Sequence, residues 1–271
     1  MKALLPVAGY ATRLHPLTKT KAKGLLPLGG KPIMQYIFDQ IEKIDEIDEA
    51  ILISNAVFYE QFVDFAENYG GRIKISVIND GTSTNETRLG ALGDLQLCID
   101  QCKIDEDIMV FVSDNYFTND NTLLNFYNFF KEKGTDCVLA SEFEDLEYLG
   151  KNFGVAVLDE ENRILNMEEK PGIPRSNIGI WASYAYTRDS VAMLKQYLEE
   201  GNKPDAPGNF PSWLCERKPI HAYVFEGQCY DIGTPDVYYS LDAKITAENA
   251  QNAAAAETPV ADDLTKLDDL K

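Results

Sequence analysis

The sequence predicts an α/β fold in which helices flank a mainly parallel, doubly wound sheet. Two observations support this prediction. Along the first half of the chain, short apolar runs alternate with longer segments whose apolar residues recur at helical spacing. In addition, residues 108–112 read Ile-Met-Val-Phe-Val, an unbroken apolar run typical of a central strand that is buried on both faces. Alternating strands and helices of this kind build a parallel sheet.

The first half supplies these elements in a regular order. Pro32 stands near the start of the first helix, a position where its missing N–H leaves no hydrogen bond unmade. The expected elements are a strand at 1–7, a helix at 32–44, a strand at 50–54, a helix at 59–69, a strand at 73–78, a helix at 87–100, a strand at 108–112, a helix at 121–133 and a strand at 137–141.

The second half predicts a less regular mixture. It begins with a hairpin of residues 153–158 and 163–167 around an acidic turn, and it continues with a strand at 178–186, helices at 190–199 and 209–216, a strand at 220–225 and a helix from 234 to 256. We expect one main domain at 1–250, followed at 251–271 by an acidic tail or helix. Composition alone leaves both forms open for that end.

Size and charge exclude several classes of protein. The 271 residues are 45% apolar, which is enough for a sizeable core and argues against global disorder or a disulfide-stabilised miniprotein. Asp and Glu number 44 against 25 Lys and Arg, a net charge of −19. Because this charge repels phosphate backbones, we expect no nucleic-acid partner. An anionic ligand would need a local cluster of basic residues.

The sequence also bears on the compartment. The amino-terminal apolar run is interrupted by Pro6 and Gly9, so it is too short for a signal peptide. No stretch approaches the roughly 18 apolar residues that span a membrane. The cysteines number five, an odd count that suits free thiols in a reducing environment. We therefore expect a cytoplasmic protein without a membrane partner.

A cationic, small-residue loop follows the first strand, at the edge of the sheet where α/β proteins bind ligands. Small residues let the backbone approach a ligand closely, and the loop contains Ala8, Gly9 and Ala11. Four of the 25 basic residues lie within eleven positions, namely Arg13, Lys19, Lys21 and Lys23. A lysine run alone usually marks a solvated surface, but together with the turn these residues indicate an anion site.

The loop matches neither of two common phosphate-binding patterns. A dinucleotide fingerprint would need glycines where Ala11 and Leu14 stand, and no helix is expected before Pro32. The glycine-rich P-loop pattern is also missing. A dinucleotide-dependent oxidoreductase and a P-loop kinase are therefore unsupported.

Two amino-terminal segments, 9–18 (GYATRLHPLT) and 23–33 (KGLLPLGGKPI), resemble the signature of the sugar-phosphate nucleotidyltransferases. This family includes glucose-1-phosphate thymidylyl- and uridylyltransferases. Two residues depart from the family pattern, because Ala11 replaces a glycine and Ala22 a proline. The resemblance implies a Rossmann-like fold with a small inserted substrate-binding subdomain, a nucleotide-binding part at about 1–142 and a sugar-phosphate-binding part at about 143–233.

Later motifs extend the resemblance along most of the chain. They are Asp80-Gly81-Thr82 with Arg88-Leu89-Gly90-Ala91, Val112-Ser113-Asp114-Asn115, Glu168-Glu169-Lys170-Pro171, Asn177-Ile178-Gly179-Ile180 and Tyr230-Asp231-Ile232-Gly233-Thr234-Pro235. Each is weak alone, but their order is that of the family. The sequence shows no carboxy-terminal β-helix of the kind that a related branch carries.

The resemblance implies a reaction in which a sugar 1-phosphate attacks a nucleoside triphosphate and releases pyrophosphate. The attacking phosphate is already anionic at neutral pH, so no general base is required. Arg13 and Lys23 would be catalytic, and Asp114 and Asp231 would bind Mg²⁺, although each aspartate in isolation would be taken for a turn residue. Nucleotide contacts are expected from Ala8, Gly9, Ala11, Thr12, Asn79, Gly81, Thr82 and Gly90. Sugar-phosphate contacts are expected from Gly154, Glu169, Lys170 and Asn177.

The base and the acceptor are less constrained. Asn79 offers a donor and an acceptor, whereas Asp80 facing the base would favour the amino group of cytosine. We expect dTTP or UTP ahead of CTP. Alternatives are a cytidylyltransferase for a phosphorylated alcohol, such as phosphocholine or an inositol phosphate, and an inactive nucleotide-sugar sensor. The protein could form a homo-oligomer.

Overall fold

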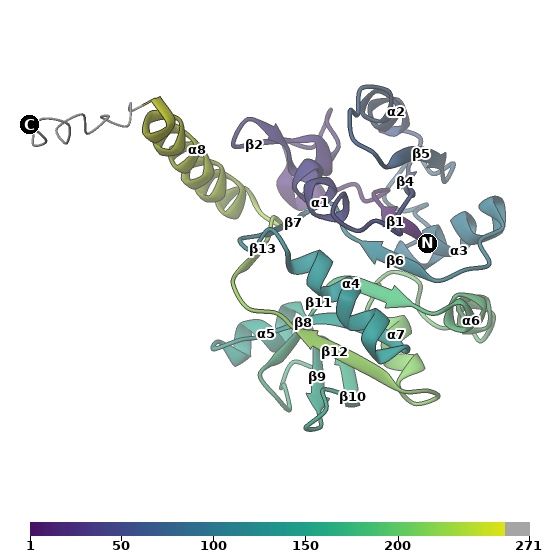
Figure 1. The fold of residues 1–271 in the computed structure, drawn as a ribbon. Coiled ribbons are helices and arrows are strands. Elements are labelled where there is room, and N and C mark those ends of the chain that lie inside the picture. The colour runs from purple at the N-terminus through teal and green to yellow at the C-terminus, as the bar shows by residue number, and fades with distance from the viewer. Residues whose placement is uncertain (258–271) are drawn as a thin grey trace, which may run out of the picture.

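A nine-stranded sheet forms the centre of the molecule, and helices pack on both of its faces (Figure 1). The computed structural model describes residues 1–257, with side chains as far as residue 253. The strand order is β10-β9-β11-β6-β1-β4-β5, and β8 pairs with both β11 and β12. These strands are β1 (Lys2–Pro6), β4 (Glu49–Ser54), β5 (Lys74–Asn79), β6 (Ile108–Phe111), β8 (Asp136–Glu142), β9 (Gly154–Leu158), β10 (Ile164–Glu169), β11 (Ile178–Tyr186) and β12 (Ile220–Val224).

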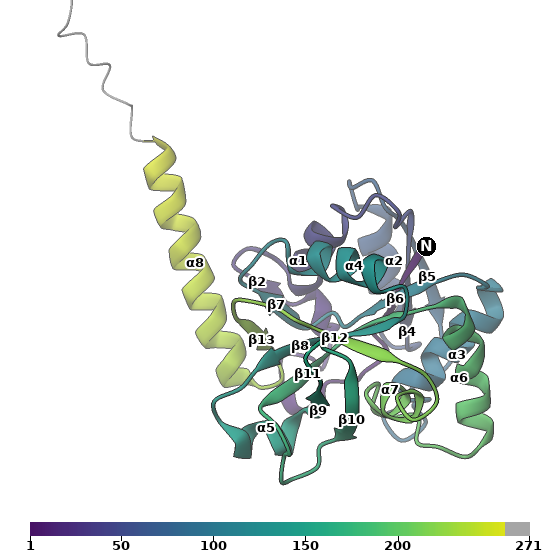
Figure 2. The same cartoon turned by 60° about the horizontal axis from the view of Figure 1, so that its bottom comes forward.

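Helices cover the two faces of this sheet in separate layers, which Figure 2 shows edge on. One face carries α1 (Ile33–Ile41), α2 (Tyr59–Glu67) and α4 (Thr122–Lys133). The other carries α3 (Ala91–Cys102), α6 (Arg188–Glu199) and α7 (Asn209–Leu214). The remaining helices are α5 (Leu146–Asn152) and α8 (Pro235–Glu257), and the short elements are η1 (Thr12–Leu14), η2 (Lys23–Leu25), β2 (Pro27–Leu28), β3 (Lys31–Pro32), β7 (Asn115–Phe117) and β13 (Cys229–Asp231).

The two helical layers explain why the central strands are apolar without a break. In β1, Ala3, Leu4 and Leu5 are all fully buried. Ala3 and Leu5 belong to the core beneath α1, α2 and α4, whereas Leu4 belongs to the core beneath α3, α6 and α7. Successive side chains of a strand point to opposite faces, so a strand covered on both sides needs an apolar residue at every position.

The strand directions confirm the α/β class with a mainly parallel sheet. β1, β4, β5, β6, β8, β9 and β12 run one way, and β10 and β11 run the other. The antiparallel β11 lies between β6 and β8 and also pairs with β9. It therefore joins the parallel first half of the sheet to the strands that follow.

Several expected boundaries differ in the structure. The helix expected at 87–100 begins only at Ala91, because Gly90 adopts a φ of +83° and the amide of Leu92 donates 2.9 Å to the carbonyl of Pro204. The helix α5 and the antiparallel pair of β7 with β13 were not expected. Both are too short to show a clear periodicity in the sequence.

The last helix, α8, projects away from the body of the molecule (Figures 1 and 2). Its first turns are anchored on the hairpin of β2 and β3, where Tyr238, Leu241 and Ile245 join a small core. The carboxylate of Asp242 accepts 2.7 Å from the amide of Gly29. α8 runs through residue 257, so residues 251–257 are helical, and the rest of the expected acidic segment, 258–271, lies outside the described residues. No helix of the described part is both long and apolar enough to cross a membrane.

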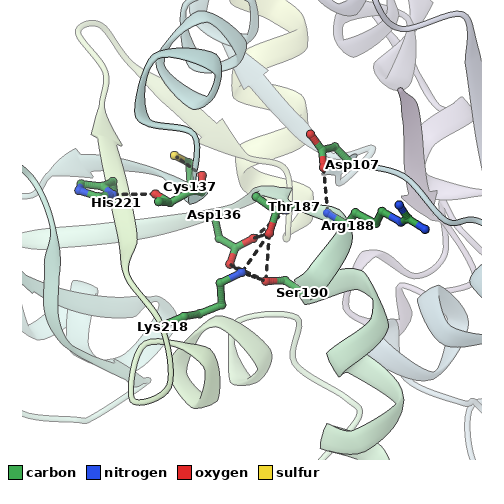
Figure 3. Close-up of polar contacts among 9 residues, drawn as sticks. Asp107, Asp136, Cys137, Thr187, Arg188, Ser190, Lys218 and His221 are labelled. Atoms are coloured by element: carbon green, nitrogen blue, oxygen red, sulfur yellow. Dashed lines mark hydrogen bonds and ion pairs between the residues drawn. The ribbon is translucent and has the colours of Figure 1, made fainter.

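A buried polar cluster fixes the other end of the sheet, where β8 begins (Figure 3). Asp136 is fully buried, and its Oδ1 accepts from the amide of Thr187 at 2.7 Å. Its Oδ2 accepts from Ser190 Oγ at 2.5 Å and lies 2.9 Å from Lys218 Nζ. The cluster joins the first turn of α6 to β8 and lies at the amino end of that strand.

Candidate active site

Two cavities adjoin each other at the carboxyl ends of β1 and β6. The first has a volume of about 490 Å³ and the second about 480 Å³. Arg13, Arg88 and Asp205 line both of them. Because carboxyl ends of parallel strands are where α/β sheets bind ligands, this pair of cavities is the candidate active site.

The loop after β1 forms one wall of the first cavity. Its lining includes five of the residues expected to contact the nucleotide, namely Ala8, Gly9, Ala11, Thr12 and Gly90. Ala11 has a φ of 45°, in the left-handed region that glycine adopts most easily, and its carbonyl accepts 2.8 Å from Thr18 Oγ1. The glycine of the family pattern at this position therefore has a conformational reason, and alanine tolerates it with some strain.

Lys23 is positioned by the chain on both sides of it. The amide of Ala22 donates 3.1 Å to Gln61 Oε1, and a Cβ on Gly24 would lie 2.9 Å from Ser113 Oγ. Close packing of this segment against the end of β6 places Lys23 Nζ 2.5 Å from Asp114 Oδ2. Despite the alanine at position 22, the lysine is therefore held against the strand-end aspartate.

Asp114 and Asp231 come together from distant parts of the sequence. Asp114 follows β6, and Asp231 ends β13, whose pairing with β7 sets Asp231 opposite Asn115. Lys23 Nζ lies 4.0 Å from Asp231 Oδ1. Burial raises the pKa of Asp231, and the negative charge of Asp114 raises it further, while nearby cations oppose both effects. Two crowded carboxylates of this kind favour a cation between them.

The second cavity centres on Glu169. Gly154, Glu169 and Lys170, which the sequence assigned to the acceptor, line it together. A Cβ on Gly154 would lie 3.0 Å from Glu169 Oε2 and one on Gly208 2.2 Å from the same atom, so two glycines enclose the carboxylate. Burial raises the pKa of Glu169, and Lys170, with Nζ 3.9 Å from Oε1, opposes that shift. The aromatic residues of the cavity wall are Phe153, Trp181 and Tyr184.

This enclosure gives a specific prediction for Gly208→Ala. The added methyl group would displace the flexible end of Glu169, so we expect the KM for the phosphorylated acceptor to rise at least about tenfold. The KM for the nucleotide should stay unchanged, because Gly208 lines only the second cavity. Steady-state kinetics with each substrate varied in turn measure both values. Gly70→Ala, where a Cβ meets nothing within 4 Å, is the matched control. Equal changes in both KM values would contradict this assignment.

Some expected site residues line neither cavity. Asn79 Oδ1 accepts 2.8 Å from the amide of Gly81, so its side chain closes its own turn. Thr82 is buried and donates from its amide and hydroxyl to Asp80. Asn177 is exposed at the start of β11. Lys19 and Lys21 are also exposed, so Arg13 and Lys23 are the members of the cationic run that reach the site.

The structure adds site residues that sequence reasoning did not select. Arg88, which the sequence named only within a motif and not as a contact, lines both cavities and lies 3.1 Å from Asp205 in the segment before α7. Asn115 lines the second cavity with a buried Nδ2 that has no hydrogen-bond partner among the described residues. Asp94 is 5% exposed and lines the first cavity. Its position one helical turn after Gly90 was the only signal for it in the sequence.

Comparisons with known proteins agree with this geometry. A family model described as nucleotidyl transferase matches residues 2–248. The chain therefore belongs to the nucleotidyl transferase family, which confirms the resemblance seen in its motifs.

Curated relatives are similar in sequence to this chain, and a solved structure shares its fold. A putative mannose-1-phosphate guanyltransferase of Sulfolobus acidocaldarius is 28% identical over 254 residues, 90% of this chain and 63% of that protein. The UTP–glucose-1-phosphate uridylyltransferase AglF of Haloferax volcanii is 27% identical over 253 residues, 93% of this chain and 99% of that protein. A crystal structure of UDP-glucose pyrophosphorylase complexed with UDP-glucose has a TM-score of 0.77 at 21% identity, covering 91% of this chain and 98% of that one, which shows a shared fold. The chain spans about half to two thirds of the length of several curated relatives that it matches.

Proposed function

We propose that the protein transfers a nucleotidyl group from a nucleoside triphosphate to a sugar 1-phosphate, giving a nucleotide sugar and pyrophosphate. The observation that carries this proposal is the arrangement of two adjoining cavities with Arg13 at their junction and the Lys23–Asp114–Asp231 cluster beside it. One cavity would hold the triphosphate and the other the acceptor. Relatives named uridylyl-, thymidylyl- and guanylyltransferases support this class of reaction.

The chemistry asks for positioning and charge stabilisation. An oxygen of the sugar phosphate attacks the α-phosphorus, and the bond to the bridging oxygen breaks as pyrophosphate leaves. No side chain needs to remove a proton, because the attacking phosphate is already anionic. Arg13 would hold the leaving phosphates with its planar guanidinium group, and Lys23 would stabilise charge at the α-phosphate.

Asp114 and Asp231 fit a divalent metal such as Mg²⁺. The pair supplies hard carboxylate oxygens, and its crowded negative charge is unfavourable without a cation. Within residues 1–257 no group of three or more acidic, His or Cys side chains forms a metal site, so phosphate oxygens and water would complete the coordination. Asp114 and Asp231 would hold the metal, which would supply positive charge to neutralise the charge that develops on the phosphates. Lys23 would then exchange its contact with Asp114 for one with the substrate.

The acceptor side suits a polyol phosphate. Glu169 makes no hydrogen bond to the described residues, so its oxygens are available to the hydroxyl groups of a sugar, and Lys170 would contact the phosphate. For the base we propose uracil or thymine ahead of cytosine. One observation favours a second candidate, a phosphorylated alcohol with a quaternary ammonium group, because Phe153, Trp181 and Tyr184 surround the same cavity as Glu169.

Pyrophosphate release separates these candidates. The protein is assayed with UTP, dTTP, CTP, GTP and ATP, each with glucose 1-phosphate, mannose 1-phosphate, phosphocholine and inositol 1-phosphate as acceptors. We expect release with UTP or dTTP and a sugar 1-phosphate. Release only with CTP and a non-sugar acceptor would establish the second candidate. No release with any pair, from protein that still binds a nucleotide sugar, would instead indicate a sensor.

A further inference from the structure

Asp94 is a buried acid that lines the first cavity, and the role assigned to it below rests on the proposed function. Asp94 lies in the first turn of α3 and is 5% exposed. Its Oδ1 is buried and has no hydrogen-bond partner among the described residues. An unpaired, buried carboxylate is costly, so a side chain of this kind needs either a proton or a ligand.

The neighbouring acid explains which group holds the proton. The charge of Asp80 and a hydrogen bond to it are two of the causes that raise the pKa of Asp94, after burial. The two oxygens of Asp80 already accept from Thr82, 2.7 Å from its amide and 2.9 Å from its hydroxyl. Two carboxylates this close cannot both be ionised cheaply, so the proton resides on Asp94. Burial, together with the charge of Asp80, raises the pKa of Asp94 to about 7.

Other charged groups around α3 act at different positions. Arg13, Arg88 and Asp205 line the same cavity and mark its junction with the second one. The strands β1 and β4 pack against α3 and carry Lys2 and Glu49. These two charges act in opposite directions on the pKa of Cys98, one turn further along α3 than Asp94. α6 contributes apolar side chains to its contact with α3. Asp80 is therefore the charge that controls Asp94.

The cavity also indicates which part of the nucleotide Asp94 would meet. The phosphates must reach the junction, where the residues common to both cavities lie. Asp94 lines the first cavity but not the second, and the same holds for Pro6, Tyr10 and Ala91. With the phosphates at the junction, the part of the first cavity that Asp94 lines is left for the base.

We propose that Asp94 is a base-binding residue that acts in its protonated form. Its hydroxyl donates to Asp80, and its carbonyl oxygen accepts an N–H from the base, such as the imide N–H of uracil or thymine. The bound base excludes water from the acid, so ionised Asp94 would face Asp80 without solvent and would oppose binding.

Asp94→Asn tests this proposal, because the amide keeps both contacts and cannot ionise. UTP affinity is measured by calorimetry without acceptor, and the ratio of the wild-type to the variant Kd cancels the titration of UTP itself. We expect a ratio near one at about pH 6 that rises to about 30 at about pH 8.5, as one proton near neutrality requires. Asp100→Asn, an exposed acid on the same helix, is the control and should follow the wild type.

Two further variants and one probe complete the test. Asp94→Ala should bind UTP weakly at every pH, because it lacks the acceptor, and thermal unfolding at the same pH values shows whether it is folded. Asp80→Asn should weaken the pH dependence of UTP affinity and move it to lower pH, because Asp94 then ionises more easily and its ionised form no longer faces a charge. N3-methyl-UTP should bind less tightly than UTP to the wild type and to Asp94→Asn alike.

The failure of this inference and that of the proposed function are distinguishable. A constant Kd ratio across the pH range, or full UTP affinity in folded Asp94→Ala, would overturn the role of Asp94 while leaving pyrophosphate release intact. A protein that binds UTP with the expected pH dependence but releases no pyrophosphate with any acceptor would retain the inference about the base and refute the proposed reaction.

Discussion

Asp114→Asn is expected to lower the rate of pyrophosphate release by roughly 10²–10³-fold, the effect of removing one group that stabilises transition-state charge. The substitution removes half of the carboxylate pair proposed for Mg²⁺ and the partner that holds Lys23 Nζ at 2.5 Å. The fold should remain intact, because the asparagine is nearly isosteric and relieves the repulsion that raises the pKa of Asp231. Turnover at saturating substrates and the melting temperature are the two measurements.

The metal dependence makes this test sharper. If Asp114 is a metal ligand, the Mg²⁺ concentration for half-maximal activity should rise in the variant. Asp120→Asn, an exposed acid in the turn after β7, is the control and should match the wild type in both respects. Unchanged turnover in Asp114→Asn would show that the proposed metal site is wrong.

Lys218→Met is expected to reduce the free energy of unfolding by about 3–5 kcal/mol, because it leaves the fully buried carboxylate of Asp136 without its cation. Ser190 and Thr187 would still donate to that carboxylate, yet neither carries charge. The cluster, drawn in Figure 3, lies at the amino end of β8. The cavities lie at the carboxyl ends of β1 and β6. Turnover per folded molecule should therefore be unchanged, and denaturant unfolding measures the loss.

The double variant Asp136→Asn with Lys218→Met separates the charge from the packing. Because it removes both charges, it should regain part of the stability lost in the single variant. Lys195→Met, on the exposed side of α6, is the control and should change stability little. A double variant less stable than Lys218→Met alone would mean that the hydrogen bonds accepted by the Asp136 carboxylate, rather than its pairing with the charge of Lys218, are what the fold needs.

Much of the fold could be predicted because its signals are local. The apolar run of β6 and the alternation of strand and helix indicate a sheet covered on both faces, and the structure confirms it. Short elements escaped prediction. β7 and β13 have three residues each and are far apart in the sequence, so only the folded chain shows that their pairing brings Asp231 to Asp114.

The site was predicted best where a motif and a strand end coincide. Arg13, Gly154 and Glu169, which the sequence selected, line the cavities. The residues expected near the base were predicted less well. The side chains of Asn79 and Asp80 accept hydrogen bonds from Gly81 and Thr82 in their own turn. Asp94 has no motif of its own, and its proposed role depends on Asp80, a neighbour from a different loop.

The anchoring of α8 determines how far this chain can be shortened. Tyr238 donates 2.6 Å to the carbonyl of Pro27, and Asn249 Nδ2 donates 2.9 Å to that of Gly29. The hairpin held in this way follows η2 directly, and η2 begins with Lys23. A truncation ahead of Asn249 would thus loosen the support of Lys23, the lysine proposed to be catalytic. Asn249 and Gly29 are 220 positions apart in the sequence. A purification tag or fusion partner belongs beyond that residue.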